Sequence, residues 1–503
     1  MTGGLTPLIV LLPLDERPVN TQLPDDVARI AGRQTVVPPV DALPRFRQPG
    51  DTARIGDWLL ERAADPQTES IVVSLDLLAY GGLIPSRTSS DSVRDVLARL
   101  DTLRTVRAQH PGVVVNAVSL VTRATDSYSP IEEPEYWEFH GRELHALGGI
   151  MHEATIADAD DRGELVIDDL GIPMEVRADF ARRRLRNHMA NLFALELLED
   201  GVLSFLAITA DDTAQRAAGT NEQWWLRHWQ RSLPGAAGLL MYPGADEVGA
   251  ILVARALAVT AEVAPTFEVV CLEPDGLLRI ASYENSPVRD SVERQIRAAG
   301  GAVSLAGETD FVLVVHAPDP DHRDWFGRTP ARTPVELIAR TVEAVRAAHA
   351  AGRRVALADV RFGNGGDNEL IAALHEAGLL LELAAYGGWN TASNSIGGVV
   401  GSCVAEAAGR ALCSFDARAS RQALLRRLLD DYAYQSIVRA EHMPTIFGNN
   451  ISPRDAATVE LAEAAITADL RAHLARLAPD TTERIIDVQL PWGRSFEVEI
   501  TFE

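Results

Sequence analysis

The sequence predicts an α/β fold, and two observations lead to this class. Short runs of Val, Leu and Ile recur along the chain, and longer stretches with helical periodicity separate most of them. Strands that are apolar throughout are typical of a parallel sheet with helices on both faces. We therefore expect a TIM-like (β/α) barrel with a helical insertion and C-terminal helices, and two doubly wound α/β lobes are the alternative.

Nine runs have the length and composition of strands. In chain order they are residues 8–14, 70–75, 112–121, 203–209, 238–242, 267–272, 311–316, 354–359 and 380–386. The intervening helices carry start and stop signals, since 91–110 begins with Asp, and 333–352 begins with Thr-Pro and ends with Gly. An eight-stranded barrel has no place for the run at 267–272, which would belong to a second lobe built from about 265 to 395.

The domain organisation follows from changes in this pattern. An α/β catalytic domain is expected over residues 1–400, with a helical insertion at about 127–201 that could serve as a lid or an oligomer contact. Residues 401–480 show only helical patterns and predict a helical C-terminal region. Residues 481–503 alternate apolar and polar positions around Pro-Trp-Gly, which predicts a terminal β-hairpin.

The composition limits the classes of partner. The 503 residues carry a formal net charge of −24, which argues against a nucleic-acid backbone as ligand. The three cysteines lack metal-ligand or disulfide spacing, and no apolar run approaches the ~20 residues of a transmembrane helix. We expect a cytoplasmic protein without cofactor or bound metal, which acts on a small molecule or oligosaccharide and could form a homo-oligomer.

Polar clusters follow most of the strand-like runs. In barrels and in doubly wound sheets, ligands bind outside the carboxyl ends of parallel strands, so these clusters are expected to converge on one site. A sugar or other polyol would need carboxylates and amides for its hydroxyl groups and an aromatic face for its ring. The expected binding residues are Asp15, Arg17, Asn20, Asp76, Tyr80, Arg87, Arg123, Asp246, Glu247, Asp359, Asn364, Asp367, Trp389, Asn390 and Asn394.

Asp211 and Asp212 are the expected catalytic pair, because they directly follow an apolar strand. Neighbouring carboxylates that are partly desolvated repel one another, so their pKa values separate and one can donate a proton while the other stays charged. The acids at 246–247 stand at a helix start, where a capping role is the simpler interpretation. Trp225 and Trp229, four residues apart, are expected on a buried helix stripe outside the site.

Several motifs together resemble one bacterial family. They are "LPLDERPVN", "SLDLLAYGGLIPSR", the strand that ends in Asp-Asp, "YPGADE", "DVRFGNGGDN" and "YGGWNTASNSIG", in order from about residue 8 to residue 400. This combination is similar to the domain of unknown function 4127. The resemblance implies a site shared across that family, and the export or cell-wall attachment modules of some relatives imply work on polysaccharides.

The residues favour a glycoside hydrolase with Asp212 as general acid or nucleophile and Asp211 as its partner. An N-acetylated sugar would suit a substrate-assisted route, and retention or inversion of the anomeric carbon stays open. Two alternatives remain. One is a divalent-metal-dependent hydrolase of a phosphorylated or carboxylated small molecule, with ligands Asp15, Asp76, Asp211 and Asp359. The other is a non-catalytic sugar-binding protein.

Overall fold

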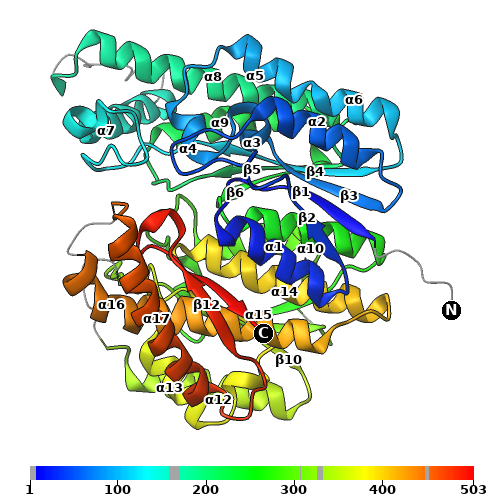
Figure 1. Cartoon of the computed structure of the whole chain (residues 1–503), viewed down its shortest axis with the longest axis vertical. Coiled ribbons are helices and arrows are strands. Elements are labelled where there is room, and N and C mark those ends of the chain that lie inside the picture. Colours follow the sequence, from blue (N-terminus) through cyan, green and yellow to red (C-terminus); the bar gives the residue numbers. More distant parts are fainter. Residues whose placement is uncertain (1–6, 158–169, 306–307, 326–331, 448–451) are drawn as a thin grey trace. The chain divides into compact units, whose positions relative to one another are not determined.

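The computed structural model describes residues 7–157, 170–305, 308–325, 332–447 and 452–503. The chain divides into two compact units, which are described separately (Figure 1). Unit 1 comprises Met1–Glu16, Arg33–Leu252 and Tyr283–Ser286. Unit 2 comprises Arg17–Gly32, Val253–Ser282 and Pro287–Glu503.

Unit 1 is built on a six-stranded sheet in which all strands are parallel, in the order β2-β1-β3-β4-β5-β6. Its strands are β1 (Leu8–Leu12), β2 (Gln34–Val36), β3 (Thr68–Ser74), β4 (Val114–Val121), β5 (Phe205–Ala210) and β6 (Leu239–Pro243). The register places Ala117 of β4 between Val73 of β3 and Leu206 of β5. These three side chains belong to one buried core, so this face of the sheet is apolar across its centre.

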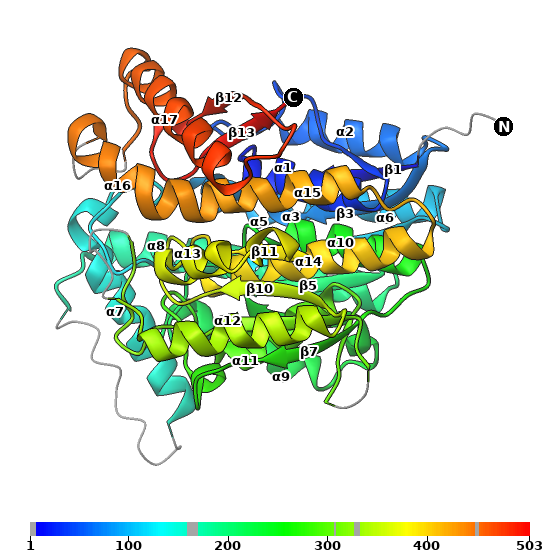
Figure 2. The same ribbon diagram turned by 90° about the horizontal axis from the view of Figure 1, so that it is seen from below.

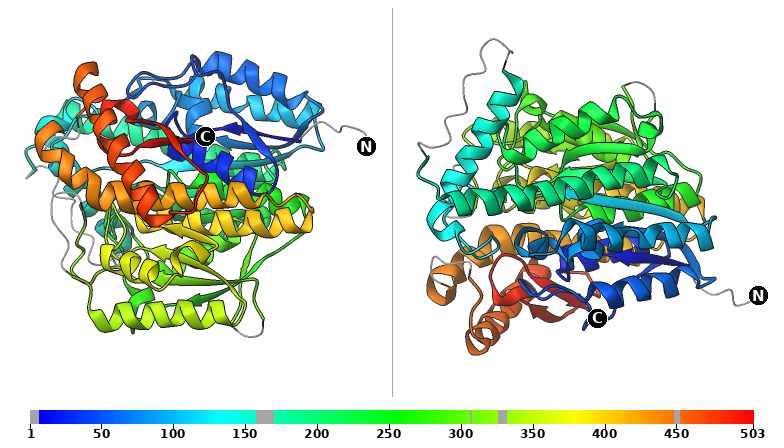
Figure 3. Two further views of the ribbon diagram at one scale, coloured as in Figure 1. Left: turned by 60° about the horizontal axis from the view of Figure 1, so that its bottom comes forward. Right: turned by 90° about the horizontal axis from the view of Figure 1, so that it is seen from above.

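The helices of unit 1 supply the other half of that core. Figure 3 shows them covering the sheet in the view from above. Their amphipathic faces turn inward residues such as Leu59, Leu100 and Leu195. The helices are α2 (Thr52–Ala63), α3 (Leu75–Tyr80), α4 (Leu83–Thr88), α5 (Val93–Leu100), α6 (Thr102–Gln109), α7 (Trp137–Ile156), α8 (Met174–Glu199), α9 (Ala218–Gln230) and the 3₁₀ turn Pro234–Gly238, while α10 (Val248–Thr260) contains the boundary between the units.

Unit 2 has a five-stranded parallel sheet in the order β11-β10-β9-β7-β8. Its strands are β7 (Thr266–Val270), β8 (Ala302–Val303), β9 (Phe311–His316), β10 (Arg354–Asp359) and β11 (Ala385–Gly387). In both sheets the first strand lies between the second and the third, and the later strands follow outward. The strand order therefore reverses beside the first strand of each unit, which is the switch point of a doubly wound fold.

Helices lie on both sides of this second sheet. In Figures 1 and 2, α12 and α14 lie on opposite sides of β10. The helices of unit 2 are α1 (Pro18–Ile30), α11 (Val288–Ala298), α12 (Val335–Ala350), α13 (Asn368–Glu376), α14 (Ala392–Ala411), α15 (Ala417–Arg427), α16 (Arg439–His442) and α17 (Ala456–Leu477). Two π-helical stretches (Leu428–Val438 and Met443–Phe447) and 3₁₀ turns at Gly276–Leu278, Leu380–Glu382 and Pro491–Gly493 complete them. The strands β12 (Ile485–Gln489) and β13 (Glu499–Phe502) pair antiparallel.

The structure confirms the α/β class and corrects the barrel. Two parallel sheets are present and neither closes, so each keeps two edge strands. The barrel was wrong because apolar strands alternating with helices are common to both architectures, and only the strand order separates them. The boundary expected at residue 400 falls inside α14. Among the described residues, no helix is long and apolar enough to cross a membrane.

The tryptophans of α9 also differ from expectation. Trp225 is 43% exposed and Trp229 is 48% exposed, so they do not form a buried stripe. Leu226 is the residue of this segment that enters the core of unit 1. Spacing of four residues identifies a shared helix face, but it does not say which face the helix turns inward.

Candidate functional site

The carboxyl ends of the unit 1 strands carry six charged side chains, which we call the arginine–carboxylate cluster. Asp211 and Asp212 follow β5 directly, and Arg123 follows β4 by two residues. The cluster consists of Arg87, Arg123, Glu132, Glu133, Asp211 and Asp212. Its members come from four places in the sequence, and the parallel strands bring them to one edge.

A glycine turn positions Arg87 within the cluster. Gly81 ends α3 in the left-handed conformation (φ 80°), and a Cβ atom there would lie 2.7 Å from the backbone of Gly50. Only glycine suits this site, because other residues would be strained and would clash. The turn allows α4 to begin at once, and the buried side chain of Asn187 donates a hydrogen bond to the Ser86 carbonyl beside Arg87.

Each aspartate of the pair has its own arginine. Arg87 Nη2 lies 2.6 Å from Asp211 Oδ2, and Arg123 Nη1 lies 2.6 Å from Asp212 Oδ2. Glu132 Oε2 accepts from both guanidinium groups, at 3.2 Å from Arg87 Nη1 and 2.7 Å from Arg123 Nη2. Such charge-assisted contacts hold planar groups in fixed orientations, so the two aspartates are rigidly placed.

Burial differs sharply between the two aspartates. The side chain of Asp211 is 7% exposed, whereas that of Asp212 is 29% exposed. Glu133 is buried and its Oε1 lies 2.9 Å from Arg123 Nε. Two guanidinium and four carboxyl groups are thus packed together, and Asp212 is the carboxyl group of this set that solvent reaches most.

The environment of Asp212 alters its titration. Burial raises the pKa of Asp212 to about 6, and the charge of Asp211 adds to the rise while Arg123 opposes it. Asp212 also has a positive φ of 25°, an uncommon conformation for a residue with a side chain. Backbone hydrogen bonds on both sides hold it there, from Asp211 N to Val121 O and from Thr213 N to Tyr283 O. Strained backbone of this kind is frequent at functional sites.

Asp76 stands next to this cluster in α3. Its Oδ2 accepts a hydrogen bond from Leu120 N at 3.0 Å. Burial raises the pKa of Asp76 to about 7, and the charge of Asp211 contributes to the rise. Asp76 therefore shares the electrostatic environment of the pair, while its side chain is almost entirely buried.

The other predicted residues of unit 1 are buried and have structural contacts. The guanidinium of Arg186 lies 4.8 Å from the ring centroid of Tyr80. Asp15 and Asp246 are buried. Glu247, directly before α10, accepts a hydrogen bond from Ala245 N, and burial raises the pKa of Glu247 to about 8, so it is largely neutral at pH 7.

The motif "DERPVN" is shared between the units. Asp15 and Glu16 belong to unit 1, where Glu16 accepts a hydrogen bond from Phe46 N. Arg17 and Asn20 belong to unit 2. Arg17 lies over the ring of Trp492 at 4.7 Å and 3.5 Å from Glu497, both in the C-terminal segment of that unit.

Asp359 and Asp367 lie in a buried polar cluster of unit 2. Asp367 Oδ2 lies 3.0 Å from His316 Nε2 and accepts a hydrogen bond from Thr333 Oγ1 at 2.5 Å. Asp359 Oδ2 accepts from Asp367 N at 2.7 Å and from Tyr386 OH at 3.4 Å. Burial raises the pKa of Asp359 to about 6. Asp367 also caps α13, so this cluster braces the glycine-rich loop after β10.

The remaining predicted residues surround the start of α14. Trp389 is buried and its ring centroid lies 5.5 Å from that of Phe496, so it packs inside unit 2. Asn364 and Asn390 both have positive φ, and Asn364 N donates to Asn390 O. Asn394 lies in the first turn of α14, where its N–H donates to the capping Thr391 side chain.

Sequence reasoning missed five polar residues of these clusters, one of which is Tyr386 on β11, which donates to Asp359. Glu132 and Glu133 sit in the insertion as an acid pair, and the two predicted arginines needed such partners once buried. His316 ends β9 and Thr333 precedes α12, and neither position carries a distinctive spacing. An arginine that is expected at a polar site without an acidic partner therefore indicates that a carboxylate should be sought elsewhere in the sequence. A single His at a strand end gives no such indication.

No metal-ligand set is formed by the described residues. Among them, no group of three or more His, Cys, Asp or Glu side chains is arranged to hold a metal ion. The four aspartates considered as ligands do not form such a group, and Asp359 belongs to a different unit from Asp15, Asp76 and Asp211.

Comparison with known proteins identifies one family. No curated protein and no solved structure matches this chain significantly. One family model, described as "Protein of unknown function (DUF4127)", matches residues 9–501. That match spans both units and confirms the resemblance carried by the motifs. The chain therefore belongs to the DUF4127 family.

Proposed function

We propose that the chain is a glycoside hydrolase that works at the arginine–carboxylate cluster of unit 1. Asp212 is the general acid and Asp211 is its carboxylate partner. The observation that carries the proposal is the contrast between two adjacent carboxyl groups. Asp211 is buried against Arg87, whereas Asp212 is partly exposed with a pKa raised to about 6.

The raised pKa suits proton donation to a glycosidic oxygen. An acid of pKa about 6 is about one-tenth protonated at pH 7 and mostly protonated at pH 5. General acids work best with a pKa near the working pH, because they are then both available and strong enough. Asp212 meets this condition, and its exposure allows a substrate oxygen to approach it.

Asp211 has the complementary task. Cleavage of a glycoside passes through a transition state with positive charge on the sugar ring, which a fixed carboxylate stabilises. Arg87 holds Asp211 in one orientation, at 2.6 Å. With an N-acetylated sugar, the same carboxylate would orient the acetamide group, whose oxygen would then attack the anomeric carbon.

The arginines and glutamates preorganise the pair. Arg123 contacts Asp212, Glu132 and Glu133, so moving the acid would break several ion pairs at once. Groups that are already in place need no reorganisation during the reaction, and such preorganisation is a large part of enzymatic rate enhancement.

The test is hydrolysis of aryl glycosides and aryl N-acetylglycosaminides by the whole protein and by Asp212→Asn. With a poor leaving group, which needs a proton, Asp212→Asn is expected to lose about 10²-fold or more in kcat/KM. With a nitrophenol leaving group, which hardly needs one, the loss is smaller. Asp41→Asn is the matched control, because Asp41 is exposed on the surface of unit 1, where it forms an ion pair with Arg54.

Two results would contradict the proposal. One is full turnover by Asp212→Asn on the poor leaving group. The other is an absence of hydrolysis with every glycoside of both anomeric configurations while the protein remains folded.

A further inference from the structure

Unit 2 contains a pocket that is lined by neither of the two proposed catalytic residues, Asp211 and Asp212. It is an open hollow with about 290 Å³ of empty space, a volume that includes adjoining solvent, and it is lined by loops that follow β7, β9, β10 and β11. These loops stand at the carboxyl ends of the strands, and β7 and β9 flank the switch point of this sheet. Ligands of doubly wound folds bind in that place.

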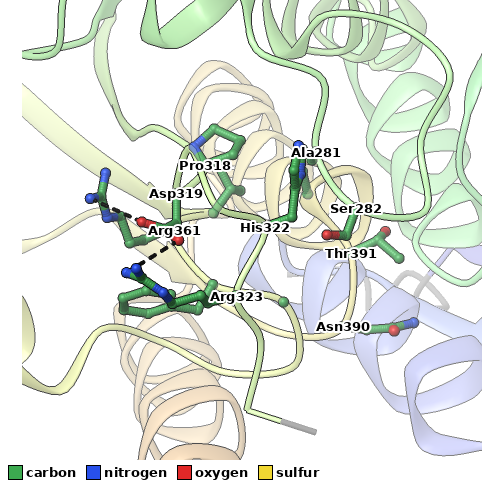
Figure 4. Close-up of a pocket in the computed structure, with 13 residues that line it drawn as sticks. Ala281, Ser282, Pro318, Asp319, His322, Arg323, Arg361, Asn390 and Thr391 are labelled. Atoms are coloured by element: carbon green, nitrogen blue, oxygen red, sulfur yellow. Dashed lines mark hydrogen bonds and ion pairs between the residues drawn. The ribbon is translucent and has the colours of Figure 1, made fainter. Parts of the chain in front are cut away.

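The polar side chains of the pocket are arranged in two groups. Figure 4 shows Asp319, Arg323 and Arg361 on one side and Ser282, Asn390 and Thr391 on the other, with His322 between them. Apolar atoms of Ala281, Pro318, Val360, Phe362 and Ala392 complete the lining. A pocket with convergent polar groups on an apolar wall is the usual form of a small-molecule site.

Asp319 is close to both arginines without a short bond to either, while Arg361 Nη1 donates to Glu273 Oε2 at 2.6 Å on its other side. Asp319 lies 3.5 Å from Arg361 Nη2 and 3.6 Å from Arg323 Nη1, both longer than the 2.7–2.9 Å of a direct charge-assisted hydrogen bond. Asp319 is 3% exposed and Arg361 is 5% exposed. Asp319 Oδ2 accepts no hydrogen bond and Arg361 Nε donates none. Buried polar atoms normally have partners, so an acceptor and a donor are left for a ligand.

An unsatisfied acceptor and an unsatisfied donor on the same side of the pocket favour a ligand with hydroxyl groups. A hydroxyl group can donate to the carboxylate and accept from the guanidinium at the same time. Arg323 and Arg361 bring two positive charges and Asp319 and Glu273 bring two negative charges, so a charged ligand gains no net attraction here. The hydroxyls of Ser282 and Thr391 and the amide of Asn390 offer further partners of the same kind on the opposite side.

We propose that this pocket binds hydroxyl groups of a neutral polyol. The hydroxyl groups are bound between Asp319 and Arg361 and by the polar groups across the pocket, and the carbon skeleton lies on the apolar wall. The site is a second one, within unit 2, and it does not depend on the chemistry proposed for Asp211 and Asp212.

The experiment is calorimetric titration of the whole protein with D-glucose, D-mannose, N-acetyl-D-glucosamine and myo-inositol, and separately with inorganic phosphate. Saturable binding of at least one polyol is expected, and Asp319→Asn should weaken it about 10-fold or more, because a hydrogen bond to a charged group is lost. Asp487→Asn is the matched control with less than about 2-fold effect, since Asp487 is exposed on β12 of the same unit, accepts a hydrogen bond from Gln489 and does not line the pocket.

Further variants separate this site from the proposed active site. Asp212→Asn should bind the polyol as tightly as the wild type, even if it has lost hydrolytic activity. If Asp319→Asn does not fold, Ser282→Ala should still weaken binding by about 3-fold or more. The proposal is overturned if no polyol binds, if folded Asp319→Asn and Ser282→Ala both bind it unchanged, or if only phosphate binds in a way that Asp319→Asn strengthens.

Discussion

The two units share a strand order but differ in what their strand ends carry. In unit 1 the carboxyl edge holds the buried Arg87 and the partly exposed Arg123, which form ion pairs with four carboxyl groups. In unit 2 it holds a pocket in which Asp319 is only loosely paired. The same topology places both sets of side chains at the carboxyl edge of a parallel sheet, where ligands of doubly wound folds bind, and the side chains differ between the two edges.

The difference also concerns the loops that carry these groups. In unit 1 the ion pairs themselves fix the functional side chains. In unit 2 a separate buried cluster around Asp359, Asp367 and Tyr386 fixes the loop, and the pocket lies beside it. Unit 2 thus keeps its structural polar groups distinct from its proposed binding groups, and unit 1 does not.

The largest effect is expected from Arg123→Met in unit 1. Removal of this guanidinium leaves Asp212, Glu132 and Glu133 without a main partner, and should lower the free energy of unfolding by about 3 kcal/mol or more. Urea denaturation at pH 7 measures it. Arg104→Met, at an exposed network on the same unit, should cost less than about 1 kcal/mol. Equal losses of unfolding free energy in the two variants would contradict the view that the arginine–carboxylate cluster stabilises unit 1 more than an exposed ion-pair network does.

A smaller effect is expected at the braced loop of unit 2. A Cβ atom on Gly366 would lie 2.0 Å from Tyr386 OH, so Gly366→Ala should lower the unfolding free energy by about 2 kcal/mol. Tyr386→Phe removes that oxygen, and the double variant should therefore cost less than the sum of the single variants. Thermal or urea unfolding measures the coupling, and strictly additive costs would contradict the contact.

The pH dependence of stability tests the burial of Glu247. Its pKa is raised from 4.5 to about 8, so the folded state binds the proton more tightly than the unfolded chain. Its contribution to stability is complete below pH about 4.5 and is lost as the pH rises to about 8. The side chain of Glu247→Gln cannot ionise. The free energy of unfolding of this variant should therefore exceed that of the wild type by about 1–3 kcal/mol at pH 8, and the two should be almost equal at pH 4.

The control for this experiment is Glu61→Gln, at an exposed position of unit 1. Its stability difference from the wild type should be small and nearly independent of pH. A constant difference for Glu247→Gln across the pH range would show that this carboxyl group titrates normally in the folded protein.

Much of the fold could be predicted because buried strands consist of continuous apolar runs that are visible in the sequence. All nine runs overlap strands of the structure, from β1 to β11. The two strands that were missed, β2 and β8, have three and two residues, lie at sheet edges and are not fully buried. Edge strands bury little apolar surface, so they leave no continuous apolar run. Strand order was not predictable, because it depends on where each crossover helix packs.

The site was predicted in part for a similar reason. Polar residues after strands were identified correctly as strand-end residues, and Asp76, Arg87, Arg123, Asp211 and Asp212 lie together in unit 1. The sequence could not assign the strand ends to two sheets, and Asp359 and Trp389 belong to unit 2. Nor could it reveal that Trp389 is buried against Phe496.

The central claim is that Asp212 donates a proton in glycoside hydrolysis. The most direct measurement is kcat/KM against pH, from pH 4 to 9, for the wild type and Asp212→Asn on a glycoside with a poor leaving group, whose departure needs a proton. The wild-type value should fall tenfold per pH unit above about pH 6, as the acid loses its proton, and Asp212→Asn should lack this limb. A limb that persists unchanged in Asp212→Asn, or a wild-type rate that rises through pH 6, would contradict the assignment.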